Sequence, residues 1–216
     1  MFDYSRAMMV QLYLSRLVFE TIGSTPRVSN PRFIMGLDSS YTSDTQIAVA
    51  VLYDAHRDEY VWRSHMLLKP TIPYIPGLLA FREAPGYIRL AKSSPILPDL
   101  LIVDGHGLAH PRGFGIASHV GLVLDKPSIG VAKKHLAGKI EEKDGRKIIV
   151  VKDTPVGEVV KTSKSEIYVS IGYKITLEDA VTTVKNLLTP SHKLPKPLQE
   201  ADTYSKKLRN QYKNKA

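Results

Sequence analysis

The stretch LLIVDGHGLAHPRGFGIASHVG, residues 100–121, opens with a run of leucine and β-branched residues that ends on a carboxylate, Asp104. A short apolar run of this kind predicts a buried strand over 100–104. The glycines that follow it leave room for a ligand to approach the backbone. A helix is expected from about 115 to 124 and a further strand at 128–131, so the stretch predicts a β-α-β unit. Open α/β sheets usually bind ligands at the carboxyl ends of their strands, and Asp104 and Lys133 both fall there.

The segments before this unit predict a helix followed by an antiparallel meander. Residues 4–22 carry apolar side chains at helical spacing, which indicates an amphipathic helix that covers a sheet. These side chains are Val10, Leu14, Leu17 and Val18. Three runs rich in β-branched and aromatic residues, separated by polar turns, predict strands at 32–41, 46–53 and 58–68. A second helix should begin near Gly77, and Pro85 and Gly86 should break or kink it.

The C-terminal part predicts a further antiparallel patch and two more helices. An Asp144-Gly145 turn signal lies between short β-prone runs. Thr176 and Asp179 form a capping box for a helix that ends at Thr189-Pro190, and a last helix could start after Pro197. We find no repeat or linker, so a single domain over 1–216 is expected, with a basic tail from about 204 to 216. The order of elements predicts an α/β fold whose mixed central sheet is flanked by helices.

The amino-acid composition limits the kinds of active site and partner that this chain can have. The chain has 216 residues, no cysteine, and 30 lysines and arginines against 21 acidic residues, which gives a formal charge of +9. The absence of cysteine excludes disulfides, thiolate catalysis and thiolate zinc sites. The positive excess favours a polyanionic partner such as nucleic acid, although a solvated basic tail would explain part of it. No apolar run is long enough to span a bilayer, so a soluble cytoplasmic protein is expected.

Three carboxylates are candidates for one metal site. If Asp38, Glu83 and Asp104 converge, they repel one another unless a cation compensates, and the fitting ion is Mg²⁺, with Mn²⁺ as a substitute. Lys133 would add positive charge where negative charge develops, as metal-assisted hydrolysis of a phosphodiester requires. Each acid also has an ordinary alternative: a turn acceptor, a surface residue paired with a helix arginine, or a cap.

Two loops are candidates for substrate contacts. Tyr74-Ile75-Pro76-Gly77 is a stiff, proline-braced tip of the kind that can open a base stack, although Tyr74 and Ile75 could equally pack on the sheet. Among the loop histidines, His110 ranks first because the neighbouring Pro111 and Arg112 suit a phosphate-facing turn. The role of His106 is left unassigned. The remainder of a G-x-G-x-x-G nucleotide fingerprint is missing, because position 110 is histidine.

Four segments resemble the motifs of the endonuclease V family of deoxyinosine-specific DNA repair nucleases. They are GLDSSY at 36–41, PYIPGLLAFRE at 73–83, VDGHGLAHPRGFGIASHVGL at 103–122 and SIGVAKKHLAG at 128–138. The resemblance implies a ribonuclease H-like fold and Mg²⁺-dependent cleavage of the second phosphodiester bond 3′ to a deaminated adenine, which leaves a 3′-OH and a 5′-phosphate.

The resemblance also implies roles for individual residues. Asp38, Glu83 and Asp104 match metal-binding carboxylates, and Lys133 matches the catalytic lysine. Residues 74–77 match a strand-separating wedge, and His110 matches a substrate contact, to which we add Arg112. The segments that build the hypoxanthine pocket supply Leu79, Gly105 and Gly115.

The C-terminal motif departs from the family. Where the family has Leu-Pro-Glu-Pro-Thr-Arg followed by Ala and then His or Asp, this chain reads LPKPLQEAD at 194–202. Asp202 matches the position of a further metal-site residue, but the family's Glu and Arg are replaced by Lys196 and Gln199.

The leading hypothesis is therefore a monomeric, metal-dependent endonuclease that acts on deoxyinosine in DNA and needs no obligate protein partner. The alternatives are an inosine-specific ribonuclease acting on RNA, a non-catalytic basic module that binds nucleic acid, and a nucleotide-binding α/β protein.

Overall fold

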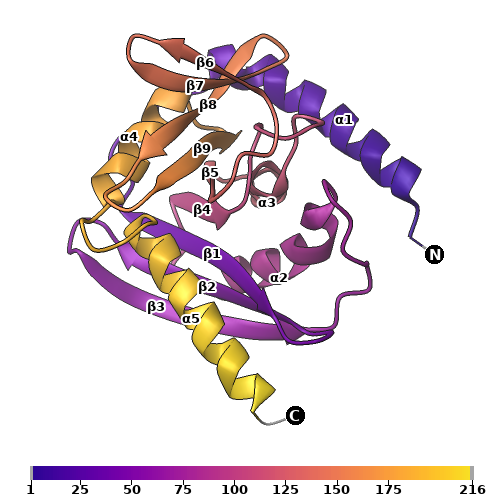
Figure 1. The fold of residues 1–216 in the computed structure, drawn as a ribbon. Coiled ribbons are helices and arrows are strands. Elements are labelled where there is room, and N and C mark those ends of the chain that lie inside the picture. The colour runs from indigo at the N-terminus through magenta and orange to yellow at the C-terminus, as the bar shows by residue number, and fades with distance from the viewer. Residues whose placement is uncertain (1, 215–216) are drawn as a thin grey trace.

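Nine strands form one mixed sheet in the computed structural model, which describes residues 2–214 (Figure 1). The strand order across the sheet is β3-β2-β1-β4-β5-β9-β8-β7-β6. The strands are β1 (Phe33–Tyr41), β2 (Gln46–Asp54), β3 (Glu59–Leu68), β4 (Leu100–Asp104), β5 (Ser128–Ala132), β6 (Lys139–Lys143), β7 (Arg146–Val151), β8 (Thr154–Lys161) and β9 (Glu166–Tyr173). Only the β1–β4 and β4–β5 pairs are parallel, as the predicted β-α-β unit requires. The α/β class with a mixed sheet is confirmed.

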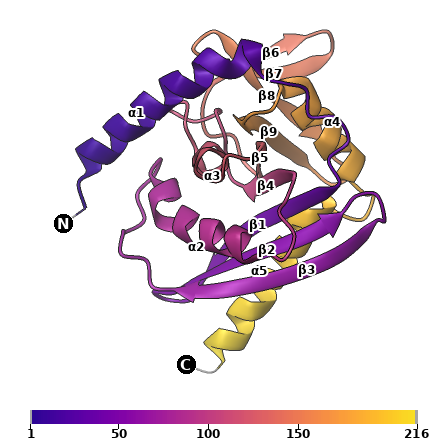
Figure 2. The ribbon, with the colours of Figure 1, turned by 180° about the vertical axis from the view of Figure 1, so that it is seen from behind.

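The described residues also form five helices, four of which cover the two faces of this sheet. They are α1 (Tyr4–Thr21), α2 (Leu79–Ser93), α3 (Ile116–Leu124), α4 (Leu177–Leu187) and α5 (Lys196–Lys213), with a 3₁₀ turn at Ile22–Ser24. Apolar side chains of α2 and α3 pack with one face of β1, β2 and β4. The side chains of α4 and α5 pack on the opposite face. Figure 1 shows α5 in front of the β1–β3 strands, and Figure 2 shows it behind them. Among the described residues, no helix is both long and apolar enough to cross a membrane.

The parallel pairing of β1 and β4 brings two predicted acids to neighbouring positions. Leu37 pairs with Val103, so the next residues along the two strands, Asp38 and Asp104, lie side by side at the same edge. Side chains alternate between the faces of a strand. Leu37 faces α2, so Asp38 faces α5. The pairing of β1 with β4 thus places Asp38 next to Asp104.

The first helix differs from its prediction. Its buried residues are Ala7, Gln11, Ser15 and Val18, whereas Val10 and Leu17 are exposed. Instead of covering a sheet, α1 lies over the loop between β4 and α3, where Gln11 donates to the Phe114 carbonyl. The apolar periodicity was misleading because the buried stripe carries polar side chains that bond to backbone.

Two further expectations need correction. Pro85 lies inside a continuous α2 rather than breaking it, although it cannot donate the usual helical hydrogen bond. The half of α2 beyond Pro85 is fixed by packing, because Gly86 fits against Ala48 of β2. Residues 204–213 of the expected basic tail form the second half of α5, where Leu208 is buried against β2, and residues 215–216 of that tail lie outside the described residues.

The close packing of α5 on β1 depends on one glycine, Gly36. A Cβ built on Gly36 would lie 2.2 Å from the carbonyl oxygen of Pro197, in the first turn of α5. Backbone atoms at that distance cannot be moved aside by a side-chain rotation. The missing side chain of Gly36 therefore lets α5 approach β1 closely enough to carry its residues over Asp38.

We expect Gly36→Ala to lower the free energy of unfolding by roughly 1–3 kcal/mol, because the methyl group overpacks the contact between β1 and α5. Urea unfolding followed by circular dichroism measures this. Gly23→Ala is the matched control, because a Cβ there meets nothing within 4 Å. Equal urea midpoints of unfolding for the two variants would contradict the claim that α5 packs closely on Gly36.

Candidate active site

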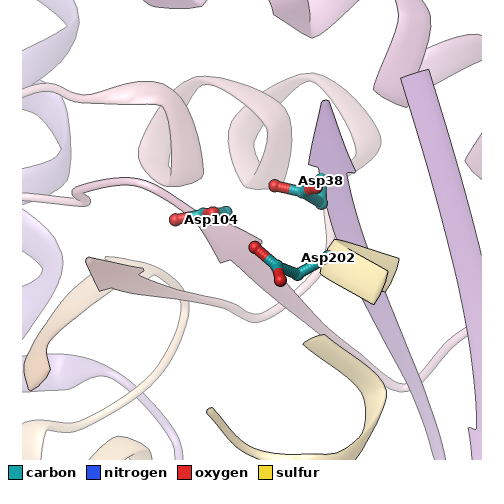
Figure 3. A group of neighbouring side chains, drawn as sticks. All are labelled: Asp38, Asp104 and Asp202. Atoms are coloured by element: carbon teal, nitrogen blue, oxygen red, sulfur yellow. The ribbon is translucent and has the colours of Figure 1, made fainter. Parts of the chain in front are cut away.

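Three aspartates from three elements meet at the carboxyl ends of β1 and β4. Asp38 lies on β1, Asp104 ends β4, and Asp202 lies on α5 (Figure 3). Each offers one carboxylate oxygen, and these oxygens all lie within 4.8 Å of one another. Asp38 and Asp202 are each 5% exposed. We call these three residues the aspartate trio.

Two lysines compensate part of this negative charge. Lys133, directly after β5, places its Nζ 2.7 Å from Asp104 Oδ2 and 2.8 Å from Asp202 Oδ1. Lys206, one turn along α5, donates to Asp202 Oδ2 at 2.6 Å. Burial works to lower the pKa of Lys133, but Asp104 and Asp202 outweigh it and hold that pKa above its usual value. Lys133 therefore stays charged at neutral pH.

Asp38 forms no ion pair with any of the residues 2–214. Its partner is the hydroxyl of Ser205, which donates to Asp38 Oδ2. Burial and the neighbouring Asp104 carboxylate raise the pKa of Asp38 well above its usual value. A close cluster of hard oxygen donors with uncompensated charge is the donor set that suits a divalent cation such as Mg²⁺. The residues present therefore fit a metal ion.

Glu83 approaches the site from the other face of the sheet, on α2. Its carboxylate is outside the trio and accepts hydrogen bonds from Tyr41 at 3.0 Å and from Tyr87 at 3.1 Å. Burial raises the pKa of Glu83 to about 7, although both tyrosine hydroxyls favour its charged form. Of the three acids that the sequence analysis first proposed for one metal site, Asp38 and Asp104 lie together. The third member of the cluster is Asp202 and not Glu83.

A small pocket lies next to the aspartate trio. One of its lining residues is Gly105, which directly follows Asp104 in the chain. The pocket encloses about 200 Å³. Almost all the residues predicted to contact the substrate line it, together with Ala80, His106, Ile116 and Leu136. The predicted residues in the lining are Tyr74, Ile75, Pro76, Gly77, Leu79, Gly105, His110 and Gly115. We call this space the base pocket. Its mostly apolar walls and the exposed Tyr74 at its mouth suit a planar ring.

Arg112 is absent from that lining because it turns inward. The Gly77 carbonyl accepts three hydrogen bonds, from Arg112 Nη2 at 2.6 Å, His110 Nε2 at 3.1 Å and Gln11 Nε2 at 3.0 Å. Arg112 Nε also donates to Gln11 Oε1 at 2.6 Å. In this structure His110 and Arg112 thus hold the 74–77 loop, whereas a phosphate-facing role was expected for both.

His110 makes these contacts as a neutral ring. Its Nδ1 accepts from the backbone N–H of Arg112 at 3.2 Å, so the proton lies on Nε2, which donates to Gly77. Burial, with the nearby Arg112 charge, lowers the pKa of His110 to about 4. The hydrogen bonds therefore persist unchanged around neutral pH.

Sequence reasoning missed Gln11 and Ser205 as parts of this region, and it left the role of His106 unassigned. The signal for Gln11 was its place at i+4 between Ala7 and Ser15, which marks a helix face containing a fully buried amide. His106 is buried at the pocket wall, where its Nε2 donates to the Lys134 carbonyl at 3.0 Å. Ser205 follows Asp202 by three residues, the spacing that puts two side chains on one helix face.

The chain is similar to known proteins over almost its whole length. The endonuclease V family model matches residues 18–203. Endonuclease V of Desulfurococcus amylolyticus is 52% identical over 208 residues, which cover 95% of each chain. The crystal structure of human ENDOV has a TM-score of 0.82 and 27% identity, covering 97% of this chain and 99% of its own. A Ciona intestinalis endonuclease V has a TM-score of 0.80 and 25% identity, covering 94% of this chain and 96% of its own. That protein was crystallised with a 24mer DNA containing an inosine followed by a ribo-adenosine.

We expect Gln11→Ala to lower the free energy of unfolding by roughly 1–3 kcal/mol, because it leaves Arg112 Nε and the Phe114 carbonyl without their buried partner. It should also speed hydrogen exchange at the Leu78 amide, which closes the 75–78 turn on the Ile75 carbonyl. Arg16→Ala, exposed on the same helix, is the control. If exchange at Leu78 is the same in both variants, Gln11 does not hold the loop.

Proposed function

This chain belongs to the endonuclease V family of DNA repair nucleases, and on that premise we propose that it acts on deoxyinosine in DNA. It hydrolyses the second phosphodiester bond 3′ to the lesion with Mg²⁺, for which Mn²⁺ substitutes, and leaves a 3′-OH and a 5′-phosphate. We further propose that it works as a cytoplasmic monomer. The observation that carries the proposal is the aspartate trio lying next to a ring-sized pocket.

The aspartate trio and Glu83 have different roles at the metal site. Asp38, Asp104 and Asp202 hold the ion, and Glu83 supports it from the opposite face of the sheet. When bound, the ion supplies Lewis-acid activation of the phosphate and of the attacking water. Lys133 places its ammonium group between Asp104 and Asp202, where it can stabilise charge that develops on a phosphate oxygen.

The base pocket and the 74–77 loop provide recognition. A base inside a duplex must leave the stack to enter a pocket, and the exposed Tyr74 ring with Ile75 and Pro76 fills the space that it leaves. Gly105 and Gly115 form pocket wall because neither can carry a side chain. A Cβ on Gly115 would lie 2.2 Å from the His106 carbonyl, and Gly105 has a φ of +141°.

A second candidate is cleavage of inosine-containing RNA. The Ciona intestinalis relative was crystallised with a ribo-adenosine after the inosine, which favours a site that tolerates a ribose at that position. Family membership, in contrast, makes the chain a hydrolase acting on phosphodiester bonds rather than a non-catalytic binding module.

We expect a labelled duplex with one deoxyinosine to be nicked once, at the second bond 3′ to the lesion, and the matched adenine duplex to stay intact. EDTA should abolish nicking and added Mg²⁺ should restore it, because the trio cannot act without its cation. Competition with a matched inosine RNA decides between the two substrates. Equal cutting of both duplexes, or cutting in EDTA, would contradict the proposal.

We expect Asp202→Asn to reduce nicking by at least about 100-fold, because it removes one charged ligand while preserving the side-chain shape. Binding of the inosine duplex without metal should persist, since the base pocket is untouched. Asp144→Asn, in the exposed β6–β7 turn, is the matched control. Wild-type nicking by a folded Asp202→Asn protein would remove this residue from the site.

A further inference from the structure

A second, larger cleft opens from the aspartate trio. It encloses about 570 Å³ between the β8–β9 loop, the α4–α5 loop and the first three turns of α5. Its floor includes Ile167 and Leu194, which are buried. Two contacts join the loops across its rim: Ser163 Oγ donates to the Pro190 carbonyl at 2.8 Å, and Lys164 Nζ donates to the Ser191 carbonyl.

The lining of this cleft is strongly positive. Four lysines line it, Lys133, Lys164, Lys193 and Lys206, and we call it the lysine groove after them. Its two acids are already neutralised. Glu166 pairs with Lys147 at 2.8 Å, and Asp202 is bound by Lys133 and Lys206. Within residues 2–214 no ion pair involves Lys164 or Lys193, and both are exposed. Two full positive charges therefore face the open cleft.

The groove is continuous with the trio and lies away from the base pocket. It shares Lys133, Asp202 and Lys206 with the hollow that contains the trio, but it shares no lining residue with the base pocket. The loop leading into α2, which carries the wedge, and the loop leading into α5, which borders the groove, lie on opposite sides of the view in Figure 1. The order across the surface is therefore base pocket, aspartate trio, lysine groove.

We propose that the lysine groove holds the part of the cleaved nucleic-acid strand on the 3′ side of the scissile bond. This inference rests on the proposed function. Cleavage 3′ to the base means that a strand whose base occupies the pocket passes the trio next and continues in the 3′ direction beyond it. The groove is the positive surface on that side. Its spaced lysines match the backbone phosphates of a single strand, which bind largely by charge.

The test varies strand length on one side at a time. Single strands with one deoxyinosine carry either about two or about ten nucleotides beyond the scissile bond, lengths that bracket the site size of a single-strand groove. Apparent dissociation constants come from single-turnover nicking at increasing enzyme concentration. The wild type should bind the strand with the longer 3′ side about tenfold more tightly than the strand with the shorter one. The double variant Lys164→Gln/Lys193→Gln should lose most of this gain in affinity.

Lys92→Gln/Lys143→Gln is the matched control, because it removes two exposed lysines outside the groove. It should keep the full gain. In a parallel series of strands that are lengthened only on the 5′ side, the gain in affinity should be the same for the wild type and both double variants. The proposal is overturned if the groove variant keeps the 3′ gain, or if it loses the 5′ gain instead. Failure of the proposed function would differ, because the wild type would then not prefer inosine strands over adenine strands.

Discussion

The structure depends on holding three carboxylates within 4.8 Å of one another at the edge of a buried sheet. Like charges at this spacing repel, and burial of Asp38 adds a desolvation penalty. Lys133 and Lys206 offset part of the cost at Asp104 and Asp202 through direct ion pairs, whereas Asp38 accepts a hydrogen bond from the neutral Ser205 hydroxyl. A divalent cation bound at the trio would offset the remaining penalty.

Two long-range packing contacts set the geometry around that cluster. The close approach of α5 to Gly36 carries Asp202 and Ser205 over β1, far in sequence from Asp38. On the other side, α1 sends Gln11 into the loop region, where three side chains fix the Gly77 carbonyl. The first contact positions Asp202 and Ser205 against Asp38, and the second positions the 74–77 loop. The N-terminal part of α1, including Gln11, precedes the segment that the family model matches.

Local patterns in the sequence were sufficient for most elements, because strand alternation, helical spacing and the β-α-β order are short-range signals. They were insufficient where partners come from distant segments. Nothing near Gln11 indicates its contact with Gly77, and nothing near Asp202 indicates its approach to Asp38. Lys196, one of the departures from the family motif, likewise has a distant partner, because its ammonium group pairs with Asp58 in the turn between β2 and β3. Motif resemblance located Asp202, whereas composition and periodicity did not.

The central claim is that the aspartate trio binds the catalytic cation. The most direct measurement is a crystal structure of the protein grown with Mn²⁺, in which anomalous scattering locates the ion without prior assumptions. The account predicts one strong peak bonded to carboxylate oxygens of Asp38, Asp104 and Asp202. The absence of a peak there, with Lys133 and Lys206 still bonded to the aspartates, would contradict it.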